Sequence, residues 1–276
     1  MTKRGLGTAF ASAAISILLL GSLLSAPVDG ASRSVNLTIT ILYDNNVYDT
    51  RLEADWGFAA LIEYGEHTIL FDTGNDGPRL LANMETLGID PRSIEIVVLS
   101  HNHGDHTNGL ASLLDAGISP TLYVPASFPR WYKDWMGSRC ELVEVTNPIE
   151  VVPGLHSTGE LVASPVEQGL VVEAARGLVV VTGCAHPGIV RMVERAKEVV
   201  DGEVDLVLGG FHLLSYTESR TQRVIASLQE LGVRRVCPTH CTGEKAIALF
   251  AEAFGGNYLE GGVGRVIAVA GPPVDD

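Results

Sequence analysis

Short apolar runs and glycine turns follow one another along the chain from residue 35 onward. Brief runs rich in Val, Ile and Leu predict buried strands, and apolar residues spaced three or four apart predict helices. Strands are predicted at Val35–Tyr43, Phe58–Glu63, Thr68–Phe71, Ile94–Leu99, Thr121–Val124, Glu141–Val145, Leu170–Glu173, Leu178–Val181, Val204–Leu208 and Arg235–Cys237. Helices are predicted at Gly77–Leu87, Asn108–Ala116, Ile189–Val200, Glu218–Leu231 and Glu244–Phe254. Early hairpins followed by alternating strands and helices indicate an α/β fold with mixed sheets and outer helices, in one domain over residues 31–276.

The first thirty residues have the pattern of a targeting segment. Lys3 and Arg4 precede an uncharged stretch that contains the apolar run Ala11–Leu24. A basic start before such a run predicts an export signal, and we expect cleavage near Gly30. An uncleaved membrane anchor is the alternative, because about 20 apolar residues suffice to cross a bilayer. We therefore expect a periplasmic or extracellular protein that contacts a membrane only if residues 1–30 are retained.

Composition and charge narrow the functional classes. The chain has 276 residues, of which 46% are hydrophobic and 19% charged, so a sizeable core can form and a disordered chain is excluded. The 19 Lys and Arg against 33 Asp and Glu give a net charge of −14. Such an acidic chain repels phosphate backbones, so we expect a small-molecule substrate and no nucleic-acid partner.

Four cysteines are too few to build a disulfide scaffold in a chain of this length. They are Cys140, Cys184, Cys237 and Cys241. Export would permit disulfides, and four cysteines can pair in three ways, so a purely structural role is one possibility for each of them.

The strongest signal for chemistry is a histidine cluster directly after one of the predicted strands. His101, His103, Asp105 and His106 lie within six residues, at the carboxyl end of that strand, where α/β folds place their ligands. An extended backbone points His101 and His103 to one side, because they are two residues apart. Gly104 then lets the chain turn so that the next two donors face the same cavity. Imidazole and carboxylate ligands indicate a borderline divalent metal, with zinc first and iron or manganese as competitors.

Further donors are expected from other strand ends. A catalytic zinc typically takes three protein ligands, so four side chains from one loop suggest a second metal. His186, His212 and His240 each follow a predicted strand. Asp72 follows another strand, and we favour a role in which it accepts a hydrogen bond from a ligand histidine over direct metal binding. His67 lies in a turn and is interpreted as an ordinary exposed histidine.

The segment Ser127–Gly137 stands apart because it is rich in aromatic residues. It either forms a lid over a pocket or packs its rings against the domain. Packing is the favoured interpretation, because aromatic residues at this spacing usually do so.

These motifs resemble the metallo-β-lactamase superfamily, whose mark is the His-x-His-x-Asp-His loop. Further segments resemble the branch related to the dihydropterin ribofuranosyl-aminobenzene phosphate synthases of methanopterin biosynthesis. They are Leu42–Asn46, Trp56–Gly65, Thr182–Gly188, Gly209–Leu213 and Pro238–Gly243. The resemblance runs from about Leu42 to Gly243 and implies a four-layer αββα sandwich with one or two metals at the sheet edges.

The resemblance also implies how the donors divide between two metals. His101 and His103 would hold the first metal. Asp105, His106 and His240 would hold the second. This assignment follows from the superfamily pattern alone.

Two departures from that pattern affect the predicted ligands. The usual third histidine of the first metal would fall in Ser164–Gln168, which contains none, and we expect His186 to take its place. His156 is a weaker alternative. Cys184 stands where a bridging aspartate is usual, and it is interpreted either as a soft thiolate ligand or as a packed or disulfide-bonded cysteine. The number of metals therefore stays open.

A divalent metal lowers the pKa of a bound water to about 7, which makes hydroxide available at neutral pH. The leading hypothesis is a metal-dependent hydrolase acting on an ester, thioester, lactam or phosphoester. Asp105 would orient the nucleophile or move a proton, and His212 would face the substrate as donor or acid. The alternatives are a transferase-like synthase related to dihydropterin synthesis and a non-catalytic metal-binding or sensor protein. The sequence contains no nucleophile elbow, phosphate loop or dinucleotide turn.

Overall fold

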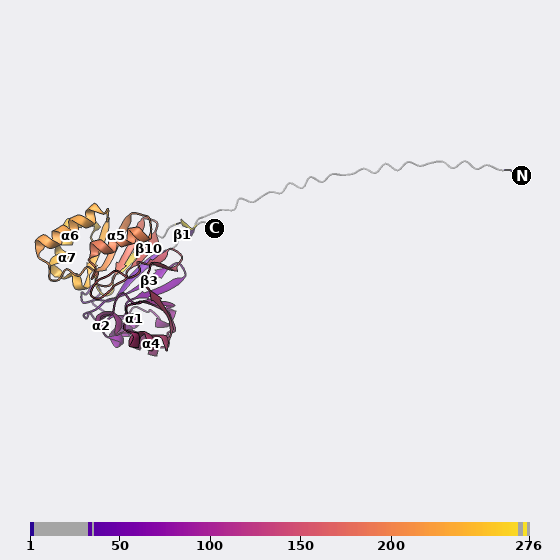
Figure 1. The fold of residues 1–276 in the computed structure, drawn as a ribbon, viewed down its shortest axis with the longest axis horizontal. Helices are drawn as coiled ribbons and strands as arrows, with labels where there is room; N and C mark the ends of the chain where they lie inside the picture. The colour runs from indigo at the N-terminus through magenta and orange to yellow at the C-terminus, as the bar shows by residue number, and fades with distance from the viewer. Residues whose placement is uncertain (3–32, 35, 270–272, 275–276) are drawn as a thin grey trace. The chain divides into compact units, whose positions relative to one another are not determined.

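The computed structural model describes residues 1–2, 33–34, 36–269 and 273–274 (Figure 1). Apart from its first two residues, the predicted targeting segment lies outside the described residues. Contacts group Ser32–Asp275 into one unit. Among the described residues, no helix combines the length and apolar character needed to cross a bilayer.

One sheet has seven strands in the order β14-β2-β3-β4-β5-β6-β7. The strands are β2 (Leu37–Tyr43), β3 (Ala59–Tyr64), β4 (His67–Phe71), β5 (Ile96–Val98), β6 (Thr121–Pro125), β7 (Glu141–Val145) and β14 (Val266–Val269). Strands β14, β2, β3 and β4 pair antiparallel, whereas β4, β5, β6 and β7 pair in parallel. The carboxyl ends of β4 and β5 therefore meet at the same edge of this sheet.

A second sheet has six strands in the order β13-β12-β11-β10-β9-β8. The strands are β8 (Ile149–Val152), β9 (Leu155–Ser157), β10 (Leu170–Ala174), β11 (Gly177–Thr182), β12 (Val204–Gly210) and β13 (Arg235–Thr239). Strands β8 to β11 pair antiparallel, and β11, β12 and β13 are parallel. Short strands β1 (Arg33–Ser34) and β15 (Pro273–Val274) pair separately.

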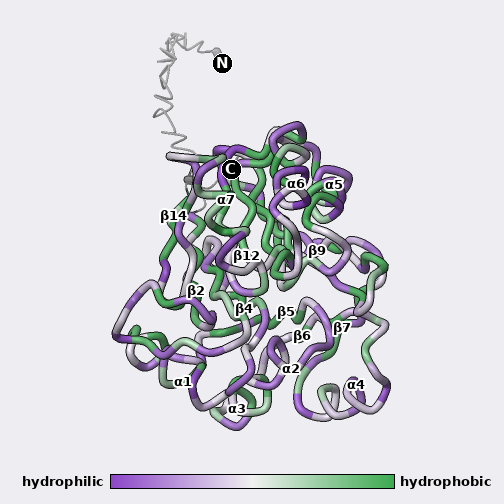
Figure 2. Tube along the Cα trace, turned by 90° about the vertical axis from the view of Figure 1, so that its left-hand side faces the viewer, coloured by the Kyte–Doolittle hydropathy of each residue, from purple (hydrophilic) through white to green (hydrophobic). Residues whose placement is uncertain are grey.

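Helices cover the outer faces of both sheets. They are α1 (Gly77–Thr86), α2 (Gly104–Thr107), α3 (Leu110–Asp115), α4 (Arg130–Gly137), α5 (Ile189–Val199), α6 (Glu218–Glu230) and α7 (Glu244–Phe254), with short 3₁₀ turns η1 (Pro91–Ser93), η2 (His240–Thr242) and η3 (Gly255–Asn257). Figure 2 shows α1 to α4 and α5 to α7 at opposite ends of the view, with the strands between them.

Three apolar clusters hold these layers together. One lies between the two sheets, a second lies under α5, α6 and α7, and a third lies under α1, α3 and α4. Alternate residues of strand β11 belong to two different clusters. Val179 and Val181 face the other sheet, whereas Val180 faces the helices. Strands buried on both faces need continuous apolar runs, which is the pattern seen in the sequence. The predicted four-layer αββα sandwich is confirmed.

Several elements differ from the predictions. The predicted helix Asn108–Ala116 is observed as α3, which begins at Leu110, and the short helix α2 before it was not predicted. Gly109 lies between the two helices, where a Cβ atom would lie 1.9 Å from the carbonyl oxygen of Thr73. The aromatic segment contains helix α4, and its rings stack on one another, with Tyr132 and Trp135 5.6 Å apart. Strands β8, β9 and β14, each three or four residues long, were not predicted.

Val179 and Val162 allow the same substitution to be compared inside and outside the core, since Val179 is fully buried and Val162 is 92% exposed. We expect Val179→Ala to lower the free energy of unfolding by about 2 kcal/mol, because the lost methyl groups leave a cavity. Val162→Ala should change it by less than about 0.5 kcal/mol. Urea denaturation measures both values, and equal losses would contradict the placement of Val179 in the core.

Candidate metal centre

Loops from both sheets meet at the carboxyl ends of their parallel strands. The histidine loop follows β5, and Asp72 follows the neighbouring β4 in the same sheet. In the other sheet, Cys184 and His186 follow β11, His212 follows β12 and His240 follows β13. The strand order therefore brings the donors predicted from strand ends into one region.

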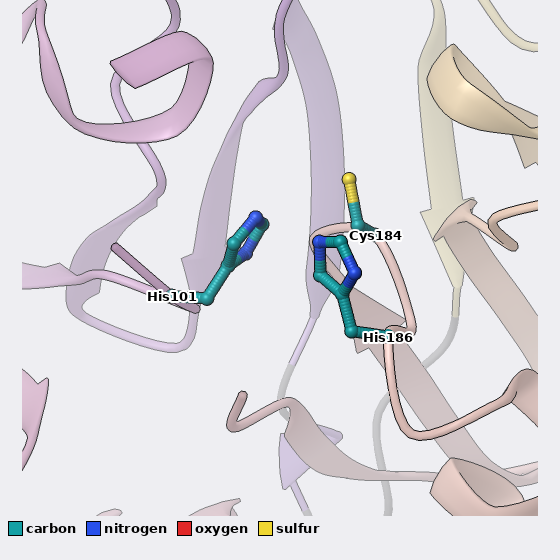
Figure 3. A group of neighbouring side chains, drawn as sticks. All are labelled: His101, Cys184 and His186. Atoms are coloured by element: carbon teal, nitrogen blue, oxygen red, sulfur yellow. The ribbon is translucent and has the colours of Figure 1, made fainter. Parts of the chain in front are cut away.

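His101, His103 and His186 form the first part of this centre. The Nε2 atom of His101 lies 3.2 Å from Nδ1 of His103. The His186 ring lies 4.7 Å from that of His101 and 4.9 Å from that of His103, measured between centroids. His186 thus occupies the space beside the first two histidines, where a third imidazole was expected. Figure 3 shows His101 and His186 reaching toward one another from different strands, with Cys184 beside them.

A second part of the centre contains Asp105, His106 and His240. The Oδ2 atom of Asp105 lies 3.6 Å from Nε2 of His106 and 3.5 Å from Nε2 of His240. The Sγ atom of Cys184 lies 3.2 Å from Nε2 of His106. The donor atoms of Cys184, His106 and His240 all lie within 4.8 Å of one another, and so do those of Cys184, His101 and His186. Cys184 therefore stands between the two histidine groups.

Asp72 supports these donors from behind. Its Oδ2 atom lies 2.7 Å from Nδ1 of His106 and accepts a hydrogen bond from the Ser100 hydroxyl, while Oδ1 accepts one from the Ser100 amide. Ser100 Oγ also lies 2.8 Å from Nδ1 of His101. These contacts leave Nε2 of each ring directed to the centre, which is how outer hydrogen bonds orient metal-binding histidines. The role favoured for Asp72 from the sequence is the one observed.

Asn45 supports His240 in the same way. Its Oδ1 atom lies 2.9 Å from Nδ1 of His240, and its amide donates to the His240 carbonyl oxygen at 3.4 Å. The sequence analysis did not identify Asn45, although it quoted the segment that contains it. An isolated asparagine carries no spacing signal that would have marked it.

Glu167 is the largest omission from the sequence analysis. Its buried carboxylate accepts hydrogen bonds from three consecutive amides, those of Cys184, Ala185 and His186, at 2.9, 2.9 and 2.7 Å. Burial raises its pKa to about 7, against the effect of these amides. The stretch Ser164–Gln168 lacks the usual histidine, but it contains Glu167, which holds the loop that carries His186.

The loops of the centre contain strained backbone. Among the described residues, four other than glycine have positive φ: Asp72 at 59°, Ala185 at 57°, His212 at 54° and His240 at 50°. Each such conformation costs about 1–3 kcal/mol and persists only where surrounding contacts enforce it. The strain is confined to strand-end loops that carry or support the donors.

Burial and neighbouring imidazoles keep two of the histidines neutral. Burial, followed by the charges of the surrounding histidines, lowers the pKa of His101 well below its usual value. Burial and its histidine neighbours likewise lower the pKa of His186 to about 4. A neutral imidazole has a free lone pair, so both rings are in the form that binds metals.

In the second group, Asp105 and His106 favour their charged forms. Burial opposes the charged form of His106, but the Asp72 carboxylate outweighs it and raises the pKa of that ring to about 9. Burial also disfavours an ionised Asp105, yet its contacts with His240 and His106 hold its pKa well below the usual range. Asp105 is therefore an anion facing two imidazoles.

The remaining candidates are the cysteines and two further histidines, His156 and His67. All four cysteines carry free thiols, so the disulfide alternative does not occur. The donor atoms of Cys241, Cys184 and His212 lie within 4.8 Å of one another, a group that the sequence analysis did not anticipate. His156 on β9 contacts Glu173 on β10 at 3.0 Å, away from the donors, and His67 pairs with Glu95.

The donor set fits a divalent cation. The Nε2 atoms of His186 and His240 are buried and have no hydrogen-bond partner among the described residues. A buried polar atom without a partner costs about 1–3 kcal/mol, which a bound cation would offset. Imidazole, carboxylate and thiol groups are together the ligands of zinc and similar metals.

Comparison with known proteins agrees with this description. The family model of the metallo-beta-lactamase superfamily matches residues 57–240. The chain is 30% identical over 280 aligned positions to the 7,8-dihydropterin-6-methyl-4-(beta-D-ribofuranosyl)-aminobenzene-5'-phosphate synthase of Methanocaldococcus jannaschii, with 83% of this chain and 95% of that protein covered.

Two solved structures are similar as well. One is a metal-dependent hydrolase of the beta-lactamase superfamily, with 26% identity, a TM-score of 0.72, and coverage of 85% of this chain and 99% of that one. The other, a metallo-beta-lactamase fold protein from Bacillus subtilis, has 13% identity, a TM-score of 0.62 and the same coverage, and shows the fold alone. The chain is therefore an enzyme that belongs to the metallo-beta-lactamase superfamily.

Proposed function

We propose that the protein is a metal-dependent hydrolase of a small molecule that contains an ester, thioester, lactam or phosphoester bond. The observation that carries this proposal is the convergence of imidazole, carboxylate and thiol donors from four strand-end loops. The buried Nε2 atoms of His186 and His240 support it, because neither has a hydrogen-bond partner among the described residues, and that of His240 has only the Asp105 carboxylate beside it at 3.5 Å. A divalent cation, for which we propose zinc, would satisfy both atoms.

The donors divide into two groups for two cations. His101, His103 and His186 would hold one, and Asp105, His106 and His240 would hold the other. Cys184 lies within reach of both groups and takes the place of a shared ligand. Bound cations would polarise the substrate and lower the pKa of a coordinated water to about 7.

Two side chains are placed to handle protons beside these cations. Asp105 is 19% exposed at its side chain and faces the centre, so its carboxylate can accept a hydrogen bond from the attacking water and orient it. His212 is exposed, and its ring lies 4.3 Å from that of His186. From this outer position a ring N–H group can donate a hydrogen bond to the leaving group.

A cavity of about 750 Å³ adjoins the centre and offers space for the substrate. His240 lines it, and the Trp56 ring lies 4.9 Å from the His240 ring. Leu213, Leu214 and Tyr216 supply apolar walls, which is typical of small-molecule sites. The cavity supports a substrate with an apolar part next to the bond that is cleaved.

A synthase is the second candidate, and the relative from Methanocaldococcus jannaschii favours it, because the match covers 95% of that protein. The test is an assay for joining a dihydropterin to a ribofuranosyl-aminobenzene phosphate. Product formation without hydrolysis of ester, thioester, lactam or phosphoester substrates would replace the hydrolase proposal.

We further propose that residues 1–30 export the protein. The basic start and the apolar run that follows support this proposal. Mass spectrometry of the protein expressed with its leader tests it: a mature chain beginning near residue 31 outside the cytoplasm is the expected result, and an intact chain retained in the membrane would indicate an anchor instead.

Removing a donor from the histidine loop should remove metal and activity together. We expect His103→Ala and Asp105→Ala to lower turnover about 100-fold or more and to reduce metal content, because each variant loses a ligand atom. Elemental analysis and a hydrolysis assay on the same samples measure both. His67→Ala is the matched control, since His67 pairs with Glu95 outside the centre. Full metal content and full activity in both loop variants would refute the assignment.

Asp72→Asn tests the support behind His106. The variant keeps the size of the side chain but removes the anionic acceptor of the His106 ring, so metal affinity should fall about 10–100-fold. Competition with a chelator measures the affinity, and a thermal melt of the same sample reports whether the fold persists. Unchanged affinity would show that the 2.7 Å contact does not orient the ring.

Metal analysis of protein purified without added metal tests the number of sites. We expect close to two divalent ions per chain, and a melting temperature that falls when a chelator removes them, because binding to the folded state alone stabilises it. One ion per chain would show that only one histidine group binds. Bound metal without turnover on a broad substrate panel would favour a sensor protein.

A further inference from the structure

Two sulfur atoms and one imidazole lie together at the edge of the centre. The donor atoms of Cys184, Cys241 and His212 are all within 4.8 Å of one another. Cys184 also belongs to the two histidine groups, whereas Cys241 and His212 belong to neither of them. The hydrolase proposed above does not need Cys241 at all, so its position calls for an explanation.

Backbone geometry holds the group in place. Cys241 lies in the 3₁₀ turn η2 immediately after His240, whose φ of 50° directs the chain into that turn. His212 has a φ of 54°, at the end of β12. A Cβ atom on Gly210 would lie 2.5 Å from the carbonyl oxygen of Gly183, 2.7 Å from Sγ of Cys241 and 3.2 Å from Cα of Cys184, so a larger residue would crowd both cysteines and the backbone before them.

The two thiols are buried and have few other partners. Cys184 and Cys241 are 3% and 5% exposed, and Sγ of Cys241 contacts the carbonyl oxygen of Cys184 at 3.6 Å. Cys237 differs although it is equally buried, because it packs in the apolar cluster between the sheets and belongs to none of the three donor groups. Burial alone therefore does not place a cysteine at the centre.

We propose that Cys184, Cys241 and His212 form a thiolate-rich site for a thiophilic divalent cation such as Zn²⁺, Co²⁺ or Fe²⁺. The inference rests on the proposed metal centre and deepens it by naming sulfur ligands from two loops. Because Cys184 is shared with both histidine groups, the cation bound here is one of the two expected per chain and not a third. Thiolates favour these ions, whereas carboxylate and water ligands suit Mg²⁺, Ca²⁺ and Mn²⁺. The site therefore selects the metal by ligand type, and His212 leaves it open toward solvent, because that side chain is exposed.

Cobalt substitution tests the site without relying on activity. The full chain is reconstituted with Co²⁺ under reducing conditions, and the thiolate-to-cobalt charge-transfer absorption is recorded. We expect the band in the wild-type protein and its loss by about half in Cys241→Ser, since one of two sulfur ligands is removed. The double variant Cys184→Ser/Cys241→Ser should lose it completely. Cys140→Ser is the matched control, because it removes a thiol that belongs to no donor group.

A band of wild-type intensity in Cys241→Ser would overturn the inference. His212→Gln provides a second test at an exposed position that is safer for folding, and we expect it to weaken cobalt binding about 10-fold or more. Unchanged cobalt affinity in that variant would also overturn the inference. Cobalt bound by the wild-type protein without a charge-transfer band would reject the sulfur ligands but leave the histidine centre intact. No cobalt binding at all would reject the proposed function as well.

Discussion

The carboxylate of Asp72 is the contact on which the centre depends. It is fully buried, it follows β4, and it links that strand to the loop after β5 through Ser100 and His106. A buried carboxylate is unfavourable unless its lone pairs are used, and here two hydroxyl or amide donors and an imidazole use them. Because the same group orients His106 and holds the chain at positive φ, the sheet edge and the donor geometry form together.

Glu167 has the equivalent role in the second sheet. It fixes three successive amides of the loop that carries Cys184 and His186, and its own segment reaches the first sheet through Gln168, whose backbone amide donates to Ser100. Two buried carboxylates thus hold the loops of two different sheets in register. The donors converge because these anchors leave each loop only one arrangement.

The sequence pointed to the side chains that the structure brings together but missed the residues that support them, for physical reasons. A histidine after an apolar run marks a strand end, and strand ends of parallel sheets meet, so His101, His186 and His240 could be grouped without coordinates. Glu167 and Asn45 act through hydrogen bonds to backbone or ring atoms, and one glutamate or asparagine in a chain with 33 acidic residues carries no periodic signal. Their roles depend on contacts with loops that follow other strands, Glu167 with the loop after β11 and Asn45 with the turn after β13, and no local pattern encodes such contacts.

The absence of a side chain at Gly210 has a consequence for how this part of the chain can change. The glycine lies at the end of a buried strand, and any larger residue there would displace Cys241 and the backbone of Cys184. A Cβ atom there would also lie 2.5 Å from the backbone carbonyl oxygen of Gly183, so position 210 stays closed to larger residues even in a descendant that has lost both thiols. The glycine can therefore outlast the sulfur pair, whereas the pair cannot keep its arrangement without the glycine.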